Sequence, residues 1–180
     1  MIAMEELPEG ARGVLGWWRT ARGEEALPHA DAIDPVPLWT WLGDLNVIEG
    51  AEGDRRLIIT LVGTRILEHM GKRCQGEQVA DCVRGDPRRS PVLGLMEAAL
   101  AQSKPAFARL PGRSILGMPD WADVLALPFR SDTPTGRLLV WLAPAASPEP
   151  LRPEDEERTL WARLVRLGRG PETPIYMIDD

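Results

Sequence analysis

The stretch of sequence that decides the fold runs from Arg55 to Val83 and reads Arg-Arg-Leu-Ile-Ile-Thr-Leu-Val-Gly-Thr-Arg-Ile-Leu-Glu-His-Met-Gly-Lys-Arg-Cys-Gln-Gly-Glu-Gln-Val-Ala-Asp-Cys-Val. It opens with an almost wholly apolar run rich in β-branched residues, Leu57–Val62, which predicts a strand. Gly63 ends that strand. Thr64 then suits the N-cap of a helix, because its hydroxyl can accept a hydrogen bond from a free backbone N–H.

Two short helices are expected after this strand. The segment Ile66–Met70 is apolar at its first, second and fifth positions, which is the spacing of one helical face. Gly71 stands where a left-handed residue commonly ends a helix, and Gly76 marks a second turn before a further helical piece, Val79–Val83. A strand followed by glycine-separated one-turn helices indicates a sheet that holds short helices over one face, with a small cavity between them.

The order and spacing of these residues resemble a bacterial family of PAS domains. That family carries a Gly-Thr after its second strand and a Gly-x4-Gly spacing a turn later. The resemblance covers residues 14–143 and rests on the following matches: Trp18, Arg19, Arg22, Gly23, Pro28, Asp34, Pro35, Val62, Gly63, Thr64, Leu67, Gly71, Gly76, Val79, Ala80, Asp81, Leu127, Pro128 and Phe129.

The fold class that follows is α+β. It is a PAS-like five-stranded antiparallel sheet with short helices on one face, plus N-terminal helices and a C-terminal helix that are extra to the PAS core. Residues 1–44 are expected to form an N-terminal helical cap and residues 45–144 the PAS-like core. Residues 145–180 are expected to hold a linker, the C-terminal helix and a tail.

The remaining sequence gives the same order of elements. Apolar periodicity predicts helices over 11–22, 35–42 and 91–102, and strands over Leu45–Glu49, Ala106–Leu110, Val124–Phe129 and Arg137–Ala143. The proline-rich stretch 144–153 is typical of a linker, and a final helix is expected over Glu154–Leu167. The apolar tail Ile175–Ile178 is expected to dock on the domain.

The second strand should be covered on both sides, because it is apolar on both faces. Its residues are expected to alternate, with Leu57, Ile59 and Leu61 on one face and Ile58 and Val62 on the other. The short helices cover only one side, so the N-terminal helix or a partner subunit should cover the other. Gly13 and Gly16 weaken that helix by about 1 kcal/mol each, so tertiary packing must hold it.

Composition excludes several classes of protein. A net charge of −6 argues against a general nucleic-acid binder, which needs a basic surface. No apolar run approaches the ~20 residues of a membrane span. The acidic start, Met1–Glu6, lacks the basic and apolar pattern of a signal peptide. Cys74 and Cys82 are therefore expected as reduced thiols, and the protein in the cytoplasm.

Catalytic and metal-binding motifs are missing from the sequence. The segment Gly112–Gly117 has one residue too many for Gly-x-Ser-x-Gly, and no P-loop pattern occurs. The two histidines, His29 and His69, and the two cysteines lack the spacing of a zinc site.

The PAS resemblance raises the question whether the protein binds haem or flavin. Haem-binding members take an axial histidine from the longer helix before the third strand, and the helix 91–102 has none. The segment Gly71–Gly76 resembles the flavin-binding motif only around Cys74, without its asparagine, its aromatic residue and the later polar side chains. We therefore expect no cofactor and no metal.

Three groups of residues are candidate binding surfaces. A small cavity between helices and sheet is predicted to be lined by Leu67, Met70, Val79, Met96 and Leu100, and it would suit a small apolar ligand; ordinary core packing is the alternative. Leu160, Trp161, Leu164 and Val165 give the final helix an apolar face, which should be buried on the domain's own sheet or in a homodimer, and we favour the homodimer. The third group is a basic cluster, which is expected either to bind an anion or acidic partner or to be solvated without a binding role. It consists of Lys72, Arg73, Arg84, Arg88 and Arg89.

Two functions from different classes remain. The first is a non-catalytic sensory or regulatory module that acts in signal transduction by binding a small ligand, by protein–protein contact, or by both. The second is a small-molecule enzyme that uses the helix–sheet cavity. The first is favoured, because the sequence shows no acid/base pair, no nucleophile with its base and no metal set.

Overall fold

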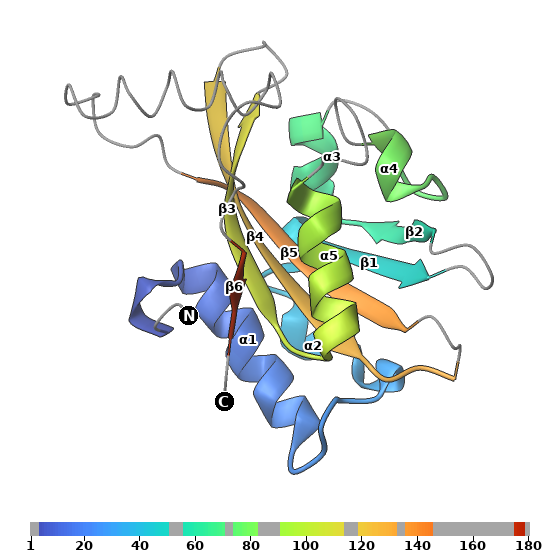
Figure 1. The fold of residues 1–180 in the computed structure, drawn as a ribbon. Helices are drawn as coiled ribbons and strands as arrows, with labels where there is room; N and C mark the ends of the chain where they lie inside the picture. The colour runs from blue at the N-terminus through green and yellow to red at the C-terminus, as the bar shows by residue number, and fades with distance from the viewer. Residues whose placement is uncertain are drawn as a thin grey trace.

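The computed structural model describes residues 4–50, 56–70, 74–82, 91–113, 119–132, 136–145 and 175–178. These residues form one antiparallel sheet with helices on both faces (Figure 1). The strand order is β2-β1-β5-β4-β3-β6. The strands are β1 (Leu45–Gly50), β2 (Leu57–Val62), β3 (Ala106–Arg113), β4 (Pro119–Phe129), β5 (Arg137–Ala145) and β6 (Tyr176–Met177).

The predicted five-stranded antiparallel sheet is confirmed, and the tail adds a sixth strand to it. Strand β6 pairs with β3, with Met177 opposite Ala106 and Tyr176 opposite Phe107. The next residue, Ile178, is buried, and its backbone N–H donates to the carbonyl of Pro105 over 2.9 Å. The expected docking of the apolar tail is therefore confirmed.

Three helices lie on one face of the sheet and the N-terminal helix lies on the other (Figure 1). The first face carries α3 (Thr64–Met70), α4 (Val79–Cys82) and α5 (Pro91–Gln102) (Figure 1). We call the contact of α4 and α5 with the sheet the helix–sheet interface. The other face carries α1 (Glu9–Arg22) with α2 (Pro35–Leu38). The described residues also form three 3-10 turns: η1 (Met4–Glu6), η2 (Ala30–Ala32) and η3 (Leu42–Asp44).

The central strands are buried on both faces, because successive side chains alternate between two apolar clusters. In β4, Val124 and Ala126 pack towards α5, whereas Leu125 and Leu127 pack towards α1. The N-terminal helix thus covers the second face of these central strands, whereas the expectation that it or a partner subunit covers the second strand concerned β2. The indole Nε1 of buried Trp18 on α1 donates to the carbonyl of Pro128 over 2.9 Å, which fixes that helix across β4.

Two glycines allow α1 to pack closely. A Cβ at Gly10 would lie 2.7 Å from the ring of Trp141, and one at Gly13 would lie 2.3 Å from the ring of Trp41. A Cβ added at Gly16 would have no such neighbouring heavy atom within 4 Å. Gly13 therefore weakens the isolated helix but admits an indole ring against its backbone, whereas Gly16 provides no such contact.

Several predicted boundaries were wrong. Strands β3, β4 and β5 are longer than the sequence predicted. They include Pro111, Gly112 and Pro119, which lay outside the predicted strands, and Pro144, which was expected to begin the linker. Pairing between β3 and β4 over their whole length overrides the weak strand propensity of these residues. The helix expected over 35–42 is also split into α2 and η3.

The expected alternation along β2 fails at Leu61. Ile59 pairs with Ile48 and Leu61 pairs with Val47, so Thr60 is an extra residue on β2. Such a bulge moves the residues beyond it to the other face of the sheet. Leu61 is 45% exposed there, so the predicted burial of β2 on both sides is wrong at this position.

Candidate functional site

The helix–sheet interface combines small side chains from the sheet with larger ones from the helices. The described helix-facing residues of β3, β4 and β5 are all aliphatic: Ala106, Ala108, Ala122, Val124, Ala126, Leu138, Val140 and Leu142. On the opposite face the same strands carry Phe107, Leu125, Leu127, Phe129, Leu139 and Trp141. The small residues on the first face allow α5 to approach β3 and β4, and Leu95, Met96 and Ala99 of α5 are buried there.

The polar side chain of Asn46 enters this otherwise apolar interface of the described residues. Asn46 lies on β1 between Val62 of β2 and Val140 of β5, and both valines pack on the helix side. Its neighbours in the strand, Leu45 and Val47, pack on the opposite face, so alternation also directs Asn46 towards the helices. The residue is 7% exposed, and its Oδ1 accepts no hydrogen bond from any described residue.

An amide carbonyl buried without a donor is unfavourable by about 1–3 kcal/mol. Asn46 therefore lowers the stability of the interface unless a further group donates to it. Sequence reasoning missed this residue, although a signal was present. Asn46 is two positions from the apolar Ile48 in a predicted strand, so alternation places both side chains on one face, and it is the single asparagine of the sequence.

Two of the five predicted cavity residues lie in one packed cluster. Val79 and Met96 are buried at the helix–sheet interface, and Leu100 packs against the same cluster while partly exposed. Leu67 is also partly exposed, and the side chain of Met70 lies outside the described part of the structure. That these residues bind a ligand remains a prediction.

The other candidate residues divide between the core and the undescribed segments. Cys74 and Cys82 are both buried at the helix–sheet interface and form no disulfide. The predicted interface residues of the final helix, Leu160, Trp161, Leu164 and Val165, lie outside the described residues, as does the whole basic cluster.

Two acids with little exposed surface, Asp123 and Asp44, each form a bidentate ion pair with an arginine. Arg109 donates to Asp123 through Nε and Nη2 over 2.6 and 2.9 Å, and the Asp123 side chain is 6% exposed. Arg65 donates in the same way to Asp44 over 2.6 and 2.5 Å. In each pair the hydrogen bond to the carboxylate raises the pKa of the arginine above its ordinary value. Both pairs tie neighbouring elements together, β3 to β4 and η3 to α3.

The side chains at the helix–sheet interface do not match those that hold haem or flavin. Helix α5 carries no histidine, and the helix-facing residues described on β3, β4 and β5 have no amide or hydroxyl for the polar edge of a flavin. Within the described ranges no three histidine, cysteine or acidic side chains are grouped as metal ligands. None of the described helices has the length and apolar character needed to cross a membrane.

Comparison with known proteins places the chain in a family. No curated protein matches the sequence. A solved structure of similar fold is the light state of the LOV domain of the blue-light photoreceptor Aureochrome1, with 13% sequence identity and a TM-score of 0.46 over 61% of this chain and 87% of that one. The profile of the family described as PAS domain matches residues 8–142, which is most of the chain and includes α1. Together with the antiparallel sheet and its helices, this match shows that the chain belongs to the PAS domain family.

Proposed function

We propose that the protein is a non-catalytic sensory or regulatory module that binds a small, largely apolar ligand at the helix–sheet interface. PAS domains are generally sensory or regulatory modules. The observation that supports ligand binding is the buried Oδ1 of Asn46, which has no donor among the described residues.

The proposal also defines the chemistry of the ligand. A ligand N–H or O–H that donates to Asn46 would remove the cost of the unsatisfied carbonyl. Asn46 lies between Val62 and Val140 on the sheet, and the apolar cluster that these valines join also contains Val79 and Met96 from the helices. Such surroundings favour an apolar body around that single polar group. An apolar molecule with one hydrogen-bond donor satisfies both requirements.

In this proposal the bound state is read by another protein molecule in the cytoplasm. The division into a cap (1–44), a core (45–144) and a C-terminal segment (145–180) is part of the same proposal. The apolar residues Leu160, Trp161, Leu164 and Val165 are its expected contact surface, in a homodimer or with a signalling partner.

Native mass spectrometry of freshly purified protein tests the proposal. We expect the wild type to retain a small molecule and Asn46→Val to lose it, because valine cannot accept the hydrogen bond. Valine also suits a buried strand, so the folded ligand-free variant should be as stable as the ligand-free wild type or more stable. Leu61→Val, on the opposite face and 45% exposed in the wild type, is the matched control and should retain the molecule.

Two results would contradict the proposal. A wild-type protein whose native mass equals that of its sequence would argue against a retained ligand. An Asn46→Val protein that carries the same added mass as the wild type would show that Asn46 does not hold it.

A further inference from the structure

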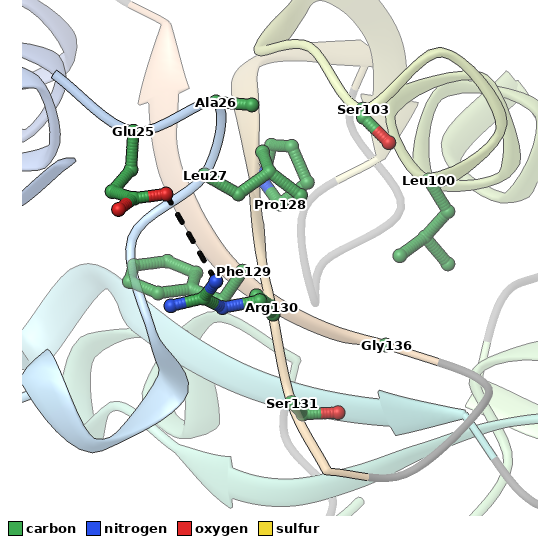
Figure 2. Close-up of a pocket in the computed structure, with 10 residues that line it drawn as sticks. All are labelled: Glu25, Ala26, Leu27, Leu100, Ser103, Pro128, Phe129, Arg130, Ser131 and Gly136. Atoms are coloured by element: carbon green, nitrogen blue, oxygen red, sulfur yellow. Dashed lines mark ion pairs between the residues drawn. The ribbon is translucent and has the colours of Figure 1, made fainter.

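A pocket of about 330 Å³ lies away from Asn46, at the end of the sheet where β4 leads to β5 (Figure 2). Three segments far apart in the sequence line it. They are residues 25–27 after α1, Leu100 and Ser103 at the end of α5, and residues 128–131 with Gly136 on the β4–β5 side. The volume is within the range of small-molecule sites, about 300–1,000 Å³.

The wall formed by the N-terminal segment is held in place by hydrogen bonds to β4 and the residue after it. The backbone N–H of Ala30 donates to the carbonyl of Arg130 over 2.8 Å, and the N–H of Arg130 donates to the carbonyl of Pro28 over 2.9 Å. Trp18 donates to the carbonyl of Pro128, which itself lines the pocket. This wall therefore exists before any ligand arrives.

The opposite wall is the C-terminal end of α5, which has an unusual residue at its cap. Ser103 has a φ of +52°, and the N–H of the following Lys104 donates to the carbonyl of Ala99 over 3.2 Å. Glycine is usual at this left-handed position, because a side chain there is strained. Serine instead places a hydroxyl at the edge of the pocket, opposite Leu27 and Pro128 (Figure 2).

The charges at the pocket cancel one another. Arg130 and Glu25 form an ion pair over 3.9 Å, with side chains that are 60% and 69% exposed, and Figure 2 shows this pair on the side away from Leu100 and Ser103. The rest of the lining is mainly apolar, with Leu27, Leu100 and Pro128 among its residues, and two serines, Ser103 and Ser131, add hydroxyl groups (Figure 2). Because Glu25 and Arg130 pair with each other, neither offers an unpaired charge to a charged ligand.

We propose that this pocket is a second binding site, for a small uncharged amphipathic molecule. Its apolar body would lie between Leu27, Leu100 and Pro128, and its hydroxyl or amide group would bond to Ser103. Because one wall belongs to the N-terminal segment and the other to α5, an occupant would couple α5 to the N-terminal layer. The site does not depend on ligand binding at Asn46.

Three six-carbon probes that differ only in their polar group test the proposal by amide NMR of the full chain. We expect 1-hexanol to shift the signals of Leu27, Ser103 and Gly136, and hexanoate and hexylammonium to bind more weakly. Leu100→Trp should abolish the shifts by filling the pocket. Ser103→Ala and Ser103→Gly should each weaken 1-hexanol binding about fivefold, the effect of one lost hydrogen bond.

The two Ser103 variants separate an effect on binding from an effect on stability. Glycine relieves the left-handed strain, so Ser103→Gly should melt at a higher temperature than Ser103→Ala while both lose the hydroxyl. Equal affinity for 1-hexanol in the wild type, Leu100→Trp and Ser103→Ala would overturn the proposal. Tighter binding of hexanoate or hexylammonium than of 1-hexanol would overturn the assignment of an uncharged ligand.

Discussion

Replacing Gly63 by alanine should destabilise the domain strongly, although this glycine lies between two regular elements. A Cβ at Gly63 would lie 2.3 Å from the carbonyl oxygen of Gly43, 2.5 Å from its carbonyl carbon and 2.6 Å from the carbonyl oxygen of Leu42. All three atoms are backbone, so no side-chain rotation relieves the overlap. The glycine of the Gly-Thr motif is thus explained by the close passage of η3.

The size of the destabilisation by Gly63→Ala depends on how firmly η3 is held. Asp44 at its end receives the two hydrogen bonds from Arg65, and its N–H donates to the carbonyl of Trp41 over 2.8 Å. Moving η3 away would strain these bonds, so we place the cost at the upper end of overpacking, about 3 kcal/mol. In a domain of this size that lowers the melting temperature by about 6–12 °C.

Thermal unfolding followed by circular dichroism measures this effect, with Gly16→Ala as the matched control. Gly16 has open space around the position of a Cβ, so alanine there should stabilise α1 by up to about 1 kcal/mol. A Gly63→Ala protein that melts within about 2 °C of the wild type would refute the packing argument.

Two further predictions concern the ion pair of β3 with β4 and the absence of a coloured cofactor. Arg109→Ala should destabilise by about 2–3 kcal/mol, because it leaves the buried carboxylate of Asp123 unpaired, whereas Asp123→Ala should cost less because the half-exposed Arg109 can turn into water. Urea unfolding compares the two variants, and the reverse order would contradict this account. The purified protein should be colourless, since α5 has no histidine and the aliphatic strand residues do not hold a flavin. A haem or flavin absorption band that scales with protein concentration would show the opposite.

The sequence predicted best those elements whose boundaries are marked by local chemistry. Leu57–Val62, Thr64–Met70 and Pro91–Gln102 have their predicted bounds, because glycine, threonine or proline stands beside a clear apolar pattern. The β3–β4 hairpin was cut short for the same reason. Its proline and glycine residues are typical of turns, and only pairing between the strands overrides that preference.

Features that depend on contacts between distant segments were not predictable. The bulge at Thr60 leaves no mark in a strand that is apolar on both faces, so the exposure of Leu61 was missed. The need for glycine at position 13 comes from the ring of Trp41, which packs against α1 only in the folded chain. The pocket beside Ser103 is built from three separate segments, and no sequence motif marks it.

Asn46 provides the most direct test of ligand binding at the helix–sheet interface. As the single asparagine of the sequence, it gives one pair of side-chain amide signals when asparagine alone is labelled with ¹⁵N. We predict that this pair of signals shifts between protein as purified and protein stripped by unfolding and refolding, and that it returns to its first position when the extracted small molecule is added back. Identical signals in all three samples would contradict the central claim that Asn46 holds a ligand.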